Sequence, residues 1–303
     1  MSVRPLAVVP VLAALLSAGA ALAHGWHDGF NVNVRHDGEP QSCADVEVEA
    51  GSRAVATAEQ SLTVPRSSEP LKVNPASNSG VSVSGWDREE YEVLVCKAAA
   101  AGRRSDGGDT AARERVGEIE AHLEGRRLVT TGPSGDEWVA FLIIHAPARA
   151  AMEIETRNGP LDVSAASGRF TIRGENGPVG LRNVDGEITV DLENGPVSLD
   201  GIGGSVRVRT ENGPIDIHLQ GSDWRGQGLD ARAVNGPISL KMDDGYTGGV
   251  VVESSGHAPW SCGGQCGRGS RTWDDDSRRI SFGTTPPRVR VATTNGPIEI
   301  DGR

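Results

Sequence analysis

The chain contains few aromatic residues, little lysine and less positive than negative charge. Aromatic residues make up 4% of its 303 residues, and 30 Lys and Arg stand against 41 Asp and Glu, a formal net charge of −11. This balance disfavours nucleic-acid binding, because such proteins need a basic face to neutralise phosphates. The 37% of hydrophobic residues is more than a disordered chain carries. The composition therefore predicts a folded protein that does not bind nucleic acid.

Motifs for common hydrolytic and phosphate chemistry are also missing. The sequence has no Gly-x-Ser-x-Gly and no phosphate-cradling glycine motif, and lysine, a possible catalytic base, occurs only at Lys72, Lys97 and Lys241. Parallel β-helix hydrolases and lyases need acids or a Lys/Arg base gathered on one face. The sequence therefore disfavours an enzyme and indicates no cofactor.

Glycine is abundant, and much of it falls in a repeated tripeptide. The chain has 40 glycines, about 13% against an average near 7%. Asn-Gly-Pro occurs six times, at spacings of 18, 18, 18, 23 and 60 residues. The repeats start at Asn158, Asn176, Asn194, Asn212, Asn235 and Asn295. Because Asn and Gly tolerate a left-handed corner and Pro fits where a strand begins, the motif predicts the same turn recurring in a stacked fold.

Hydrophobic residues alternate with period two on both sides of each turn, as Ile188 and Val190 do before one turn and Val197 and Leu199 after it. This is the pattern of half-buried strands. We therefore predict an all-β fold, a single elongated β-solenoid of stacked two-strand coils of about 18 residues. The spacing of 23 is interpreted as one coil with a loop at 221–228, and the spacing of 60 as two or three coils. One short helix is expected at 109–116, and 98–108 is expected to be an exposed loop.

The first 23 residues have the features of a secretory signal peptide. Arg4 precedes an apolar run over 6–16 and the small-residue end Ala21-Leu22-Ala23. The run is shorter than the roughly 20 residues of a membrane span, so we expect a signal peptide at 1–23 and no membrane span after its cleavage. The predicted location is the periplasm or the cell surface.

Four cysteines, an even number, favour disulfides in an exported chain. Cys262 and Cys266 lie in a glycine-rich loop that can close on itself, which leaves Cys43 to pair with Cys96. A zinc site is disfavoured, because C-x3-C has no matching second pair. The predicted organisation is a disulfide-tethered lead-in at 24–60 and a repeat domain at 61–303, with regular coils at 152–243 and a loop insertion at about 256–279.

One segment and the repeats together carry a resemblance. The run 80–88, Gly-Val-Ser-Val-Ser-Gly-Trp-Asp-Arg, precedes a strand, a helix-containing loop and the Asn-Gly-Pro turns. This order resembles the bacterial putative-adhesin family of β-strand-repeat proteins, a domain of unknown function. The resemblance implies a β-solenoid in an exported or envelope-facing protein, and it brings no catalytic residues.

Three glutamates precede successive turns and would stack in one column. Glu175, Glu193 and Glu211 at coil spacing would repel one another, so a Ca²⁺ ion among them is one hypothesis. The alternative is that nearby arginines disperse the charge, with Arg173 and Arg209 flanking Asp191 in a ladder of alternating sign.

A loop near the C-terminus gathers tryptophans and acids, namely Trp260, Trp273, Asp274, Asp275 and Asp276. Exposed Trp beside carboxylates suits a carbohydrate-binding surface, because sugars stack on the ring and the acids accept hydrogen bonds. The alternative is a cap that buries both rings.

Histidines offer weaker hypotheses. Cleavage after Ala23 would expose His24 with His27 and His36 nearby, a set that can chelate copper adventitiously. His145 and His218 are interpreted as ordinary surface or hydrogen-bonded residues.

The sequence therefore predicts an exported, non-enzymatic, adhesin-like binding or surface-presentation protein of the bacterial envelope, whose partner is an envelope protein or a polysaccharide. One alternative is a periplasmic structural or accessory protein that binds another envelope component. A polysaccharide-processing enzyme on a β-helix is the third.

Overall fold

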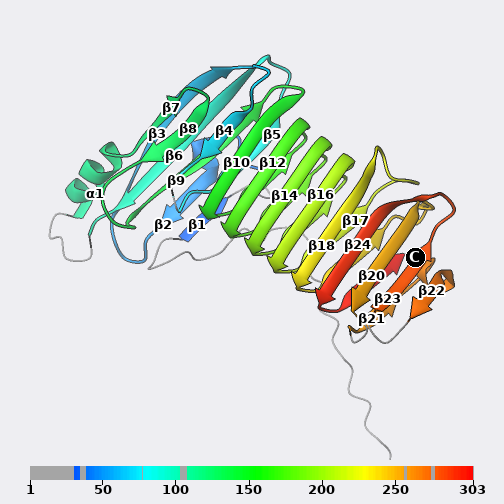
Figure 1. The fold of residues 1–303 in the computed structure, drawn as a ribbon. Helices are drawn as coiled ribbons and strands as arrows, with labels where there is room; N and C mark the ends of the chain where they lie inside the picture. Colours follow the sequence, from blue (N-terminus) through cyan, green and yellow to red (C-terminus); the bar gives the residue numbers. More distant parts are fainter. Residues whose placement is uncertain are drawn as a thin grey trace, which may run out of the picture.

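The computed structural model describes residues 31–34, 39–76, 78–102, 108–255, 258–273 and 277–302. These residues form an elongated molecule built mainly of a twelve-stranded and an eleven-stranded sheet (Figure 1). The predicted all-β class is confirmed. The predicted signal peptide and the histidines at 24, 27 and 36 lie outside the described residues. Among the described residues, none of the helices combines the length and apolar character needed to span a membrane.

Each central repeat unit contributes one strand to each sheet, and equivalent strands of successive units pair in parallel with equivalent residues opposite one another. The twelve-stranded sheet contains β10 (Ala150–Asn158), β12 (Ser167–Asn176), β14 (Asp185–Asn194), β16 (Gly203–Asn212) and β18 (Gly228–Asn235). The eleven-stranded sheet contains β11 (Leu161–Ser164), β13 (Val179–Arg182), β15 (Val197–Asp200), β17 (Ile215–Leu219) and β19 (Ile238–Met242). Residues 220–227 form a loop between β17 and β18, close to the expected 221–228.

The alternating apolar residues face inward from both sheets and form one continuous core. Phe170 and Ile172 of β12 are buried, as are Val179 and Leu181 of β13. The residues that alternate with the buried ones on β12, such as Arg169 and Thr171, face outward. The core therefore lies between the sheets, and the outer face of each sheet carries a row of side chains from every other residue.

The Asn-Gly-Pro turns form a hydrogen-bonded ladder along one side of the stack. Asn176 Nδ2 donates to Asn158 Oδ1 at 3.0 Å, and Asn194 Nδ2 donates to Asn176 Oδ1 at 3.1 Å. The ladder continues through Asn212 and Asn235 to Asn295, and at its other end Asn158 donates to Asn78. The turn residues therefore fix the register between units as well as the corner itself.

The N-terminal part continues the stack and then closes it with antiparallel strands. β4 (Leu71–Asn74) and β5 (Val81–Gly85) pair in parallel with β10 and β11. They are followed in the chain by β6 (Glu90–Ala100), α1 (Gly108–Gly117), β7 (Glu120–Glu124), β8 (Arg127–Thr131) and β9 (Trp138–Ala146). β3 (Val55–Pro65) pairs antiparallel with β6. The predicted helix is confirmed.

The expected exposed loop at 98–108 is wrong in its first residues. Ala98, Ala99 and Ala100 end β6 and are buried. The physical reason is that Ala98 and Ala100 pack against Val139 and Ala50, so their small side chains fill a layer beneath the lead-in.

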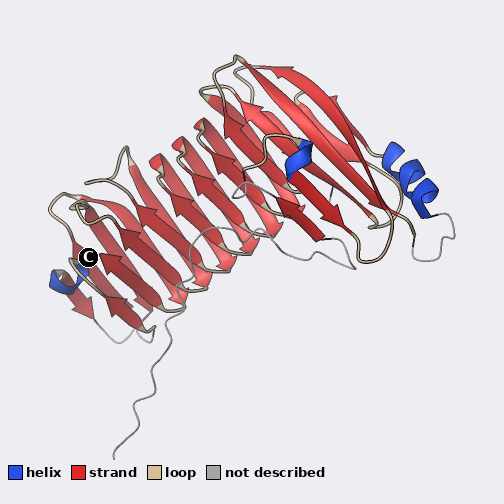
Figure 2. Ribbon diagram, turned by 180° about the vertical axis from the view of Figure 1, so that it is seen from behind, coloured by secondary structure: helices blue, strands red, loops and turns tan. Residues whose placement is uncertain are grey.

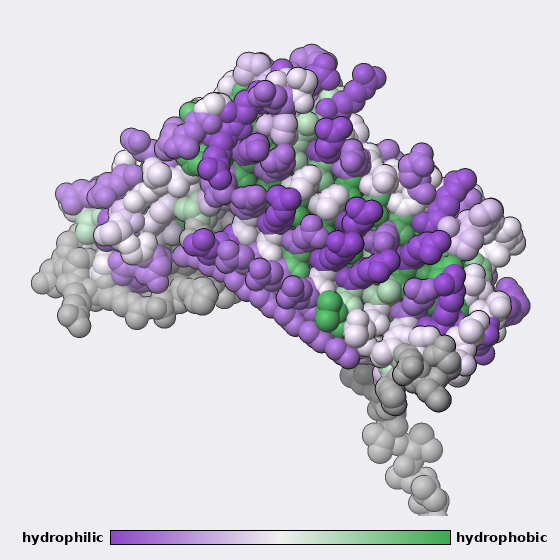
Figure 3. Space-filling model, viewed as in Figure 1, coloured by the Kyte–Doolittle hydropathy of each residue, from purple (hydrophilic) through white to green (hydrophobic). Residues whose placement is uncertain are grey.

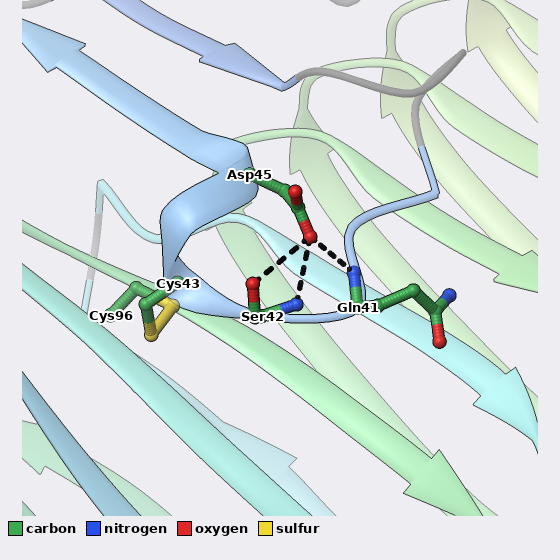
Figure 4. Close-up of a disulfide and its surroundings, with 5 residues drawn as sticks. All are labelled: Gln41, Ser42, Cys43, Asp45 and Cys96. Atoms are coloured by element: carbon green, nitrogen blue, oxygen red, sulfur yellow. Dashed lines mark hydrogen bonds between the residues drawn. A yellow bond between two sulfur atoms is a disulfide. The ribbon is translucent and has the colours of Figure 1, made fainter.

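The lead-in lies on the outer face of the eleven-stranded sheet. β1 (Asn31–Val34) and β2 (Val46–Glu49) form a separate antiparallel pair, and Val32 and Val46 pack against Phe141 and Ile143. Figure 4 shows how the segment is fastened: Cys43 is bonded to Cys96 of β6, and the Asp45 carboxylate accepts hydrogen bonds from the backbone of residues 41 and 42. The predicted pairing Cys43–Cys96 is confirmed.

The C-terminal 60-residue spacing does not form successive coils, contrary to the sequence interpretation. β24 (Pro287–Asn295) and β25 (Ile298–Gly302) pair directly with β18 and β19. In this register Asn295 Nδ2 donates to Asn235 Oδ1 at 2.9 Å and continues the asparagine ladder. The intervening segment forms β20 (Gly249–Ser255), β21 (Trp260–Cys262), β22 (Ser270–Trp273) and β23 (Ser277–Phe282), which lie beyond β24 and β25 at the end of the molecule (Figure 2). The second predicted disulfide, Cys262–Cys266, is confirmed.

The Cys43–Cys96 disulfide should stabilise the fold substantially. Its sequence separation is 53, and on the chain-entropy model closing such a loop is worth about 4 kcal/mol. We expect the Cys43→Ser, Cys96→Ser double variant to lose this amount from its free energy of unfolding in urea. The Cys262→Ser, Cys266→Ser variant is the matched control, with a separation of 4 and a smaller expected loss. Equal losses in both variants would contradict the loop-length argument.

Candidate functional site

The outer face of the twelve-stranded sheet has two grooves that cross its strands. Figure 3 shows this face with hydrophilic side chains standing over the strands and hydrophobic surface between them. The two grooves arise because outward residues two positions apart on each strand line up with their counterparts on the neighbouring strands. We call the larger one, with a volume of about 710 Å³, the wide groove, and the smaller one, with about 280 Å³, the narrow groove.

The wide groove contains all three glutamates singled out in the sequence. Glu175, Glu193 and Glu211 are outward residues at equivalent positions of β12, β14 and β16, and they form one wall. The column two residues earlier forms the opposite wall and aligns Arg173, Asp191 and Arg209 in register, as the ladder alternative predicts. The structure thus brings both predicted columns to the same groove.

The ion pairs of the wide groove differ from a simple ladder. Arg173 pairs with Glu155 at 3.4 Å, and Arg157 pairs with Glu175 at 3.3 Å. Glu193 and Glu211 are exposed and form no ion pair within the described part of the chain. Across these same residues, no three His, Cys, Asp or Glu side chains form a group suited to a metal ion. The glutamates therefore form a negatively charged side of the groove. They are not grouped as ligands around a Ca²⁺ position in the part of the chain that the structure describes.

Between the two grooves stands a group of arginines that the sequence pattern does not predict as a group, although it places Arg209 beside Asp191. The arginine ridge consists of Arg207 and Arg209 of β16, Arg232 of β18 and Arg290 of β24, all exposed. Arg232 binds both carboxylate oxygens of Asp230, at 2.8 and 3.2 Å, and this contact raises the pKa of Arg232. Arg207, Arg209 and Arg290 form no ion pair or side-chain hydrogen bond with the described residues.

The two tryptophans of the C-terminal loop lie in different environments. Trp260 is half-buried, packs against the core and donates its indole N–H to Ser254 Oγ. Trp273 on β22 is 56% exposed, with the Arg278 guanidinium 5.3 Å from its ring centroid. The acids Asp274, Asp275 and Asp276 lie outside the described residues. The cap hypothesis therefore fits Trp260, whereas Trp273 is available to a ligand.

This difference predicts opposite results for the two alanine variants. We expect Trp260→Ala to lower the free energy of unfolding by roughly 3 kcal/mol, because it removes packing against the core and the hydrogen bond that Ser254 Oγ accepts from the indole. Trp273→Ala should change it by less than about 0.5 kcal/mol. Urea unfolding measures both, and each variant serves as the control for the other. A large loss in Trp273→Ala would show that its ring is part of the cap.

The two internal histidines are hydrogen-bonded, as the sequence interpretation has it. His218 lies between two carboxylates, with Nδ1 at 2.9 Å from Asp200 and Nε2 at 3.0 Å from Asp243. Because ionised carboxylates only accept hydrogen bonds, both contacts form together when the imidazole carries two protons. The pKa of the Asp243 carboxyl is lowered, first by the Gly221 N–H and then by His218. His145 is buried and hydrogen-bonded to Ser84 Oγ at 2.8 Å.

The eleven-stranded sheet holds a buried carboxyl on its outer face. Asp162 of β11 is 8% exposed, and burial raises the pKa of its carboxyl to about 7. Arg182 lowers this pKa and Glu39 raises it, and these two residues pair with each other at 3.5 Å. The neighbouring Gly180 leaves room for the acid, because a Cβ there would lie 2.2 Å from Asp162 Oδ1.

Comparison with known proteins gives no match to a family model and none to a curated protein. Among solved structures, one described as a putative adhesin from Parabacteroides merdae is 8% identical, with a TM-score of 0.38 over 83% of this chain and 98% of that one. A putative adhesin from Bacteroides fragilis is 11% identical, with a TM-score of 0.34 over 82% and 97%. A protein from Parabacteroides distasonis described as a putative lipid binding protein is 10% identical, with a TM-score of 0.34 over 83% and 98%. Similarity at this level assigns neither a family nor a function, so the resemblance to the β-strand-repeat adhesin family stays a prediction.

Proposed function

We propose that this chain is an exported, non-enzymatic β-solenoid of the bacterial cell envelope that binds an envelope protein or polysaccharide on the outer face of its twelve-stranded sheet. In this proposal residues 1–23 are the signal peptide, 24–60 the tethered lead-in and 61–303 the solenoid domain. The observation that carries the binding role is the wide groove, which crosses equivalent positions of successive strands and so offers an extended, rigid surface along the stack.

Two further features support this assignment. The two disulfides favour an oxidising compartment outside the cytoplasm. At the wide groove, Glu155 and Glu175 are paired with Arg173 and with the neighbouring Arg157, so these charges hold one another in place as a rigid surface does.

The first test is the location of the protein. Protease treatment of intact cells, with a periplasmic protein followed in parallel, should remove the protein while the periplasmic control survives if the groove faces outward. Survival until the outer membrane is opened would support the periplasmic accessory alternative and would direct the search to a periplasmic partner by cross-linking. Recovery in the cytoplasm, with 1–23 uncleaved, would overturn the proposal.

The second test separates a binder from an enzyme. The mature protein is incubated with a panel of polysaccharides, and both retention on the polymer and release of soluble fragments are measured. We expect retention without release. Fragment release by the purified protein would overturn the non-enzymatic role and favour the polysaccharide-processing alternative.

A further inference from the structure

The geometry points to the arginine ridge as the binding site for a linear anionic glycan whose carboxylates are separated by hydroxyl-bearing sugar rings. This inference rests on the proposed binding function and names the class of ligand. It begins from an imbalance in a chain of net charge −11. Two adjacent columns of β16, β18 and β24 carry the four arginines of the ridge, and the one acid in these columns on these strands, Asp230, is already bound by Arg232.

Three arginines of the ridge are available to an anionic partner from outside the chain. Arg207, Arg209 and Arg290 are exposed and have no ion-pair partner among the described residues. A guanidinium presents a planar fork of donors that matches a carboxylate and remains charged at any physiological pH. The inner parts of these side chains stand on a regular sheet, so the three forks are held on a rigid base.

The spacing of the forks suits a chain-shaped ligand that runs along the stack. Arg207 and Arg290 occupy the same column, with Asp230 between them, so their backbones are two strand spacings, or about 10 Å, apart. Arg209 is two residues from Arg207 on the same strand, beside the wide groove. The narrow groove on the other side also runs across β14, β16, β18 and β24. An extended polymer lying in either groove would meet successive arginines.

The surroundings of the ridge select against a densely charged polymer. Glu193 and Glu211 line the wide groove next to Arg209, so a polyanion such as polyphosphate, whose charges are closer together than one per sugar ring, would bring some of them against these carboxylates. These carboxylates can accept hydrogen bonds from sugar hydroxyls. The Thr189 and Ser205 hydroxyls of the narrow groove can both accept hydrogen bonds from sugar hydroxyls and donate to them. A glycan that carries hydroxyls beside each carboxylate is therefore favoured over polyphosphate or nucleic acid.

The test measures binding of the mature full-length protein to polygalacturonate at 0.15 M salt, where the long-range repulsion from the acidic chain is screened beyond about 8 Å. The ridge variant is Arg207→Gln, Arg209→Gln, Arg290→Gln. The control variant, Arg66→Gln, Arg113→Gln, Arg127→Gln, changes the net charge equally at exposed sites far from the ridge along the chain. Methyl-esterified polygalacturonate and polyphosphate are the comparison polymers, and circular dichroism checks that both variants fold.

We expect the ridge variant to bind polygalacturonate at least tenfold more weakly than the wild type, with a smaller dependence on salt, and the control variant to bind within twofold. The esterified polymer should bind as weakly to the wild type as polygalacturonate does to the ridge variant. Equal binding by both variants, no binding of polygalacturonate by the wild type, or tighter ridge-dependent binding of polyphosphate would each overturn the inference.

The outcome is separable from that of the proposed function. A protein found in the envelope that does not bind polygalacturonate would leave the proposed function standing and remove the ridge inference. A protein that binds polygalacturonate through the ridge but is recovered in the cytoplasm would do the opposite.

Discussion

Replacing Gly195 by alanine should destabilise the protein by about 4 kcal/mol or more, and the strain of the turn backbone together with a direct clash accounts for this size. Gly195 has a φ of +141°, a conformation that L side chains rarely adopt, and an added Cβ would lie 2.2 Å from the backbone oxygen of Gly177. The turns are this close because Gly177 N–H donates to Asn194 O at 3.0 Å and Gly195 N–H to Asn212 O at 2.9 Å. A methyl group would therefore push apart two neighbouring units and their asparagine ladder.

The matched control is Gly245→Ala, in a turn where a Cβ would meet no atom within 4 Å. We expect this variant to keep the wild-type free energy of unfolding to within about 0.5 kcal/mol. Urea unfolding followed by circular dichroism measures both variants. If Gly195→Ala were no less stable than Gly245→Ala, the close backbone stacking of the turns would not be a source of stability.

The stacking of the central units could be predicted from the sequence because it depends on local chemistry that the repeat displays. Asn194, Gly195 and the following proline specify a corner, and the alternation on either side specifies which face of each strand is buried. Equal spacing of 18 residues then leaves one register, since a slip of one residue would turn the apolar side chains outward. The structure has this register at each of the equally spaced turns.

The arginine ridge could not be predicted in the same way, because its columns cross the unequal spacings. Arg207 and Arg209 lie in a regular unit, but which residue of β18 faces Arg207 depends on where the extra residues of the 23-residue spacing are placed. The position of Arg290 in the ridge is even harder to predict from the sequence. It joins the ridge only because β24 pairs with β18 across a 60-residue separation, and β20 to β23 are placed beyond it.

The environment of Asp162 was likewise hidden in the sequence. Asp162 belongs to an outward column, where an acid normally reaches solvent, and the same column has glycine at residue 180 and serine at residue 198. Asp162 differs from the usual outward acid because it is buried, on the face of the sheet where the lead-in also packs. Long-range packing of a non-repeating segment leaves no periodic signal in the sequence.

The buried Asp162 carboxyl should make the protein less stable as pH rises from 4 to 7. Burial raises the pKa of this carboxyl from its ordinary value of 3.8 to about 7 in the folded protein. Below pH 4 both folded and unfolded chains hold the proton, so there is no cost. Between these values the unfolded chain releases the proton while the folded chain keeps it, which disfavours folding by about 1.4 kcal/mol per pH unit and on the order of 4 kcal/mol in total.

Asp162→Asn removes this cost because the amide has nearly the same shape and never ionises. We expect the variant to match the wild type at pH 4 and to exceed its free energy of unfolding by about 4 kcal/mol at pH 8. The comparison is Asp216→Asn, in the same column. Desolvation raises the pKa of the Asp216 carboxyl as well, but Asp216 is far more accessible to solvent than Asp162, so its gain should be much smaller. Urea unfolding at each pH gives the difference between variant and wild type, in which the contributions of all other groups cancel. A difference that stayed constant from pH 4 to pH 8 would mean that Asp162 is ionised in the folded protein, held by Arg182 as a stabilising partner and not as a buried, protonated acid.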